Sequence, residues 1–183
     1  LIDNSQLTID NSKGNHQSPI INCQIPHNWD DYYGYRQLTH GNLHGTTMYV
    51  KDFSLDNCPL STVNSQLKKR YFLRFEGVGT YATIKVNGHD FGRYPVGRTT
   101  LTLDVTNALK QGTNRLEVKA EHPEMIADMP WVCGGCSSEW GFSEGSQPLG
   151  IFRPVVLEAT DEIRIEPFGV HIWNDEKAAN VFV

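Results

Sequence analysis

Residues 70–88 read RYFLRFEGVGTYATIKVNG, and this stretch decides the fold. Its first part, Arg70–Glu76, is rich in aromatic and basic residues, alternates imperfectly between polar and apolar positions, and stops at Gly77. Its second part, Tyr81–Val86, runs into Asn87–Gly88, a pair that favours positive φ at both turn positions and therefore a tight hairpin. We expect two strands here, followed by a return strand.

Further strand-like segments lie on both sides of this stretch. Residues 100–105 and 114–120 alternate strictly, as half-buried strands do. Residues 47–53 mix β-formers with charge, and residues 152–159 contain Pro154, which indicates a strand start or an edge position because proline donates no hydrogen bond to the ladder. No long segment has the 3.6-residue apolar period of an amphipathic helix. This pattern predicts an all-β jelly-roll β-sandwich.

Composition narrows the class of protein. The chain has 183 residues, 39% hydrophobic and 20% charged, which suits one globular domain with a sizeable core. Its net charge of −5 gives no electrostatic reason to expect nucleic acid or an anionic membrane as a partner. No apolar run approaches the ~18 residues of a membrane-spanning helix. The first residues resemble no signal peptide and begin with Leu1, so we expect a trimmed piece of a longer protein.

Six short motifs follow one another along the chain. They lie at residues 26–29 (PHNW), 49–53 (YVKDF), 70–78 (RYFLRFEGV), 82–88 (ATIKVNG), 103–116 (LDVT…GTNRL) and 150–155 (GIFRPV). No single motif is specific. Their joint order and spacing resemble the N-terminal, sugar-binding-type domain of glycoside hydrolase family 2, as found in β-galactosidases.

The resemblance implies a galactose-binding-domain-like jelly roll over residues 1–163. Residues 164–183 would be the linker and first strands of a truncated immunoglobulin-like domain. A retaining glycosidase needs two carboxyl groups about 5 Å apart, and in the family both lie on a later (β/α)₈ barrel. We therefore expect this chain to be non-catalytic and its parent to hydrolyse O-glycosyl bonds. The implied partners are the immunoglobulin-like and barrel domains of the same polypeptide and, through the parent enzyme, a carbohydrate substrate. The resemblance also suggests an extracytoplasmic setting.

The segment before Gly150 is the strongest functional candidate. Residues 120–149 show no periodicity, and a long irregular segment inside a compact domain is usually functional or tightly pinned. The resemblance implies that an acid just upstream of Gly150 reaches the mouth of the active site. Glu144 is its closest counterpart and Glu139 the reserve. Because aromatic rings suit the C–H face of a pyranose, the substrate-rim candidates also include Trp131, Trp140 and Phe142. The alternative is a loop packed on the barrel with its acids solvated.

The cysteines leave several interpretations open. Cys133 and Cys136 flank two glycines, but a redox site would need a helix N-terminus in a βαβ setting, and a zinc site about four ligands. A local disulfide between them, or two free thiols in a tight turn, is the simpler interpretation. Cys23 and Cys58 would need Cα atoms within ~7 Å to pair, which the sequence does not settle. The histidines lack metal-ligand spacing, so we expect neither a metal nor a cofactor.

The run His27–Arg36 sets aromatic residues beside acids. It suits a carbohydrate-binding rim, but the resemblance favours a structural role with Trp29 packed inside. Three functions therefore compete: an accessory domain that lends a loop to the substrate rim of its parent, an autonomous carbohydrate-binding module, and a structural spacer.

Overall fold

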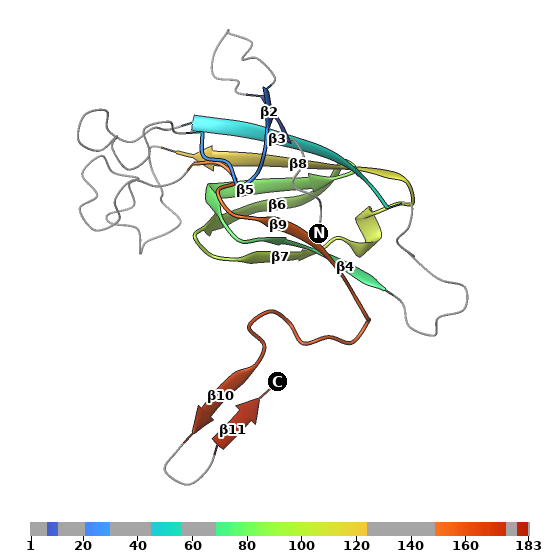
Figure 1. Ribbon diagram of the computed structural model, residues 1–183, viewed down its shortest axis with the longest axis vertical. Coiled ribbons are helices and arrows are strands. Elements are labelled where there is room, and N and C mark those ends of the chain that lie inside the picture. Colours follow the sequence, from blue (N-terminus) through green and yellow to red (C-terminus); the bar gives the residue numbers. More distant parts are fainter. Residues whose placement is uncertain are drawn as a thin grey trace, which may run out of the picture.

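A computed structural model describes residues 7–10, 21–29, 45–55, 69–123, 149–174 and 179–182. Within these residues the regular structure is almost entirely β-strand, and the paired strands run antiparallel (Figure 1). The predicted all-β jelly-roll β-sandwich is thus confirmed. No helix in this part of the chain has the length and apolar character needed to cross a membrane.

Two sheets form the sandwich. The six-stranded sheet has the order β2 (Ile21–Cys23), β1 (Leu7–Asp10), β3 (Gly45–Ser54), β8 (Thr113–His122), β5 (Val78–Val86), β6 (His89–Gly97). The three-stranded sheet has the order β7 (Leu101–Asp104), β4 (Arg70–Phe75), β9 (Val155–Thr160), and the 3₁₀ turn η1 (Thr106–Ala108) follows β7. A separate hairpin of β10 (His171–Asn174) and β11 (Ala179–Phe182) lies away from the sandwich at the end of the chain (Figure 1).

The expected strands match the observed ones in type and order, with local differences. Asn87 and Gly88 have φ of 51° and 81°, as the predicted hairpin turn requires. Pro154 immediately precedes β9, which is an edge strand of its sheet. Between Thr160 and His171 the chain forms no strand. There the Arg164 side chain turns back onto β4.

The core lies between the two sheets and is built by alternation. On β4 the side chains of Tyr71, Leu73 and Phe75 point inward and are buried. They meet the buried rows of the large sheet, which comprise Tyr49 on β3, Ala82, Ile84 and Val86 on β5, and Leu116, Val118 and Ala120 on β8. At roughly 25 cal/mol for each Å² of apolar surface removed from water, this interior supplies most of the driving force for folding.

The buried row of β8 is apolar in the middle and polar at both ends. Asn114 begins it and His122 ends it, and both side chains are buried. The Asn114 amide oxygen accepts from Lys110 N (2.9 Å) and Asn87 Nδ2 (2.8 Å), and its Nδ2 donates to the carbonyls of Lys110 and Gly112. Asn114 thus ties the turn before β8 to the β5–β6 hairpin.

We expect Asn114→Ala to lower the free energy of unfolding by about 2–4 kcal/mol, because it removes the four hydrogen bonds that the buried Asn114 side chain makes with Asn87, Lys110 and Gly112. Urea denaturation monitored by tryptophan fluorescence measures the change. Asn107→Ala, at an exposed position of η1, is the matched control and should change stability by less than ~0.5 kcal/mol. A loss at position 114 as small as the control's would contradict this role.

Candidate functional site

The predicted rim residues and the two cysteines of the predicted local disulfide all lie outside the described residues. They are Glu144, Glu139, Trp131, Trp140, Phe142, Cys133 and Cys136, within residues 124–148. What the structure does describe is the two points where this segment leaves and rejoins the sandwich. The site is therefore built from His122 and Pro123 on one side and from Leu149 on the other.

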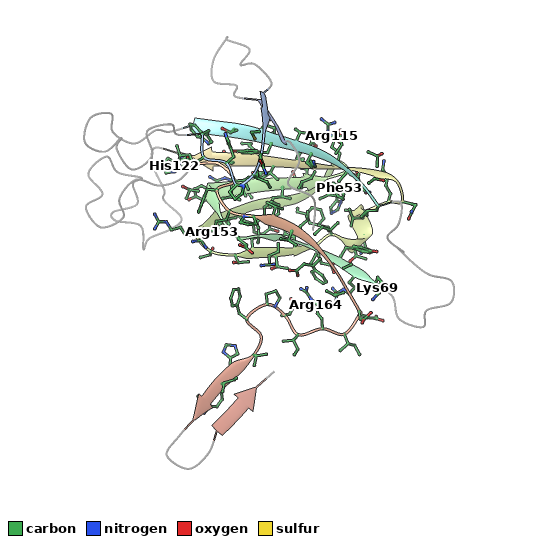
Figure 2. All side chains as sticks on the ribbon, viewed as in Figure 1. Phe53, Lys69, Arg115, His122, Arg153 and Arg164 are labelled. Carbon is green, nitrogen blue, oxygen red and sulfur yellow. The ribbon has the colours of Figure 1, made fainter. Side chains whose placement is uncertain are left out.

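The segment leaves from the end of β8. His122 is buried there, and its Nδ1 lies 2.6 Å from the hydroxyl oxygen of Thr80 on β5. A buried imidazole requires hydrogen-bond partners, so this contact fixes the ring as well as the strand end. Figure 2 shows His122 and Arg153 at the same end of the sandwich. Thr80, which contacts His122, follows Gly79, which pairs with Gly150, so departure and return lie close together.

The segment returns through Leu149–Ile151, which the PHNW motif holds. His27 N donates to Ile151 O (2.7 Å) and Trp29 N to Leu149 O (3.2 Å). In turn, Leu149 N donates to the Asn28 side-chain oxygen at 2.9 Å. On its other side Gly150 exchanges backbone hydrogen bonds with Gly79, the bond from Gly79 N measuring 2.9 Å. Residues 149–151 are thus clamped between two segments that are distant in sequence.

Gly150 is the tightest point of this clamp. Its φ is +88°, and a Cβ at this position would lie 2.8 Å from Trp29 Cδ1 and would overlap the Tyr49 hydroxyl. The Trp29 ring also covers Gly45, where a Cβ would approach it to 3.1 Å. Trp29 is half-buried rather than fully inside, and its ring packs over two glycines, which supports the structural role of residues 27–29 over a sugar-stacking one. Residues 30–36 of the same run lie outside the described part.

The polar groups of His27, Trp29 and Tyr49 near Gly150 also have structural roles. The Tyr49 hydroxyl lies 3.0 Å from His27 Nδ1, and Tyr49 is fully buried. Burial raises the pKa of Tyr49 well above its ordinary range, and the hydrogen bond with the Ile151 backbone only partly offsets this. The phenol thus stays protonated at neutral pH. The buried indole N–H of Trp29 has no hydrogen-bond partner in the described part of the chain.

Metal and thiol chemistry finds no support among the described residues. No group of three or more His, Cys, Asp or Glu side chains in them could hold a metal ion. Cys23 is a free thiol whose pKa is raised by burial, which makes it a poor nucleophile. The local Cys133–Cys136 disulfide, with two free thiols as its alternative, stays a prediction, and Cys58 lies outside the described residues.

The outer face of the small sheet carries a set of paired charges. Arg70 contacts Asp104 at 2.5 Å, and Arg74 bridges Glu76 and Glu158, both at 2.7 Å. Desolvation would raise the pKa of Asp104, but hydrogen bonds from Thr106 and Arg70 outweigh it and hold that pKa below its ordinary value. These acids have structural partners and do not resemble a catalytic pair.

Sequence reasoning missed Arg164. Its guanidinium lies over the ring of Phe72, 3.2 Å from the centroid, and only 9% of its side chain is exposed. A signal was present in the imperfect alternation of residues 70–76, because Phe72 places an aromatic ring on an otherwise charged outer face. An aromatic ring on this face must be shielded from water, but the sequence does not show which residue shields it.

We expect Gly150→Ala to destabilise the domain by about 3–5 kcal/mol, because the new methyl group meets Tyr49 and Trp29 and the backbone is left-handed. Gly88→Ala is the matched control: its φ is +81°, but a Cβ there meets nothing within 4 Å. The control should cost only ~1 kcal/mol of backbone strain. Equal losses of unfolding free energy in the two variants would refute the clamp.

Comparison with known proteins finds a matching family and several relatives. The glycosyl hydrolase 2 galactose-binding domain-like family matches residues 29–129. A beta-glucuronidase from Bacteroides fragilis is 34% identical over 100 residues, which cover 54% of this chain and 13% of that protein. A beta-galactosidase from Actinobacillus pleuropneumoniae is 24% identical over 158 residues, which cover 84% of this chain and 14% of that protein.

The solved structures show the same fold. A beta-glucuronidase from glycoside hydrolase family 2 superposes with a TM-score of 0.67 at 22% identity, covering 97% of this chain and 20% of that one. The chain therefore spans only a small fraction of the proteins that it matches. It belongs to the glycosyl hydrolase 2 galactose-binding domain-like family.

Proposed function

We propose that this chain is the non-catalytic N-terminal domain of a glycoside hydrolase that cleaves a β-glucuronide or a β-galactoside. The observation that carries this is the family match over residues 29–129, together with relatives that are named for glycosidase activity and are covered to only 13–14% of their length. The catalytic carboxylates would lie in the remainder of the polypeptide.

The domain division of the parent is part of this proposal. Residues 1–163 would form the jelly roll, and residues 164–183 the linker and first strands of an immunoglobulin-like domain. The isolated β10–β11 hairpin supports this, because a two-stranded sheet is marginally stable alone and is completed by further strands. The jelly roll would then pack against both the immunoglobulin-like domain and the barrel.

Within the parent, residues 131–149 would lend a loop to the substrate rim. This proposal is supported by the ordered residues at both ends of the loop, since a side chain that must contact a sugar hydroxyl needs a backbone held in a fixed position. His122 and Gly150 are both buried and hydrogen-bonded, at the same end of the sandwich. Glu144 would accept hydrogen bonds from sugar hydroxyls, with Glu139 as the reserve, and Trp131, Trp140 or Phe142 would stack on the ring.

In the full-length enzyme we expect Glu144→Ala to lower kcat/KM by about 10–100-fold, mainly through KM, because a rim carboxylate binds ground and transition states alike. Initial rates on chromogenic β-glucuronides and β-galactosides measure this. Glu162→Ala, an exposed acid outside residues 131–149, is the control and should have no effect. If both Glu144→Ala and Glu139→Ala match the control, the domain is a spacer rather than a rim contributor.

A second function, an autonomous carbohydrate-binding module, is favoured by the family's description as galactose-binding domain-like. Calorimetric titration of the 183-residue chain with galactosides, glucuronides and polysaccharides decides between the two. Under our proposal the isolated chain shows no saturable binding and cleaves no chromogenic glycoside. Saturable binding with unit stoichiometry would establish the module instead.

A further inference from the structure

The turn of the β5–β6 hairpin carries the only Asn–Gly pair in the sequence, Asn87–Gly88. Asparagine is among the residues that heat damages most readily. It is most reactive before glycine, because no Cβ then hinders attack by the following backbone nitrogen on the asparagine side chain. Both residues are exposed to water. Whether the pair reacts therefore depends on how the fold holds the Asn87 side chain.

The fold immobilises the Asn87 side chain through both of its polar atoms. Nδ2 donates to Ala108 O and to Asn114 Oδ1, both at 2.8 Å. Oδ1 accepts from Arg115 N at 2.9 Å, and the Asn87 backbone N–H donates to Arg115 O at 2.8 Å. These bonds direct the amide to η1 and to the start of β8. A reaction that removes Nδ2 must break both of that atom's hydrogen bonds, so it requires the hairpin turn to open locally.

We propose that Asn87 is a deamidation site of this domain, and that its hydrogen bonds to Ala108, Asn114 and Arg115 control the rate. Gly88 N attacks Asn87 Cγ, the Cγ–Nδ2 bond breaks, and Nδ2 leaves as ammonia with the Gly88 amide proton. Water then opens the resulting succinimide ring at either of its carbonyl groups, which yields aspartate or isoaspartate. The net change consumes water and releases ammonia, and no oxidant or metal takes part.

The product of this reaction does not fit the hydrogen bonds that hold Asn87. A carboxylate only accepts hydrogen bonds, yet in place of Nδ2 it would face two acceptors, Ala108 O and Asn114 Oδ1. Asn114 cannot turn its own amide to supply a donor without losing its bonds to Lys110 and Gly112. Deamidation thus breaks the tie between the β5–β6 hairpin and the start of β8. Because ammonia is lost, the break is permanent.

Peptide mass spectrometry of the 183-residue chain in mildly alkaline buffer measures deamidation at Asn87. The rate in the folded chain should be at least ~10-fold below the rate in urea, because the reaction waits for local opening. Gly88→Ala should slow the reaction in urea, since its Cβ hinders ring closure. Equal rates in the folded and unfolded chain would overturn the control by hydrogen bonds. A rate in urea no faster at Asn87 than at Asn107, which precedes alanine, would overturn the site itself.

Two variants separate local opening from global unfolding. Asn114→Ala should raise the rate at Asn87 in the folded chain by about 10-fold, because it removes one partner of Nδ2. Gly150→Ala is the matched control: it also destabilises the domain, but Gly150 lies beside Gly79, at the other end of β5. It should change the rate at Asn87 by less than ~2-fold. Equal acceleration in both variants, or none in Asn114→Ala, would overturn the local control.

The Asn87→Asp variant reproduces one product of the reaction. It should lower the midpoint of urea denaturation by about 0.5 M or more, because it sets an anion against two acceptors. Asn107→Asp adds the same charge at an exposed position of η1 and should shift the midpoint by less than ~0.2 M. Equal shifts in the two variants would overturn the structural consequence. None of these measurements involves a glycoside, so their failure is separate from failure of the proposed function.

Discussion

The structure depends on the close approach of the Gly150 backbone to the Trp29 ring and the Tyr49 hydroxyl. No residue with a Cβ fits there, and the left-handed φ of Gly150 adds a second requirement for glycine. This one contact joins the PHNW segment, β3 and the chain that leads into β9. It also closes the sandwich at the end where the proposed rim segment departs and returns, so core packing and the origin of that segment have a common cause.

The two polar ends of β8 show how buried polar side chains find hydrogen-bond partners in neighbouring segments. Asn114 satisfies the turn beside the β5–β6 hairpin, and His122 contacts Thr80 at the opposite end. Between them, Leu116, Val118 and Ala120 supply the apolar interior. A buried polar group without a partner costs more than a hydrogen bond gains. Each end therefore accepts only the neighbouring segment that offers the matching donors and acceptors, which helps to set the register of the strands.

Much of the fold could be predicted from sequence because its signals are local. The alternation in residues 100–105 and 114–120, the Asn87–Gly88 turn and the position of Pro154 each follow from the chemistry of neighbouring residues. The strands at Leu7–Asp10 and Ile21–Cys23 carry no such pattern and were not predicted. Contacts between residues far apart in the chain could not be predicted either. Examples are the packing of Trp29 over Gly150 and of Arg164 over Phe72. The candidate rim residues rest on the resemblance, and their geometry stays a prediction.

Different kinds of interaction hold the chain at Gly150 and at the end of β9. This difference fits the accessory-domain role that we propose. At the Gly150 end, steric exclusion and buried hydrogen bonds leave almost no freedom. At the exit of β9, a stacked cation and partly exposed ion pairs hold the chain, and such contacts are weaker and depend on solvent. A loop root that must place a carboxylate against a sugar needs the first kind of restraint, because small displacements weaken a hydrogen bond steeply. The chain after β9, which we propose to be a linker, needs only a preferred direction, and contacts of this weaker kind are enough to give it one.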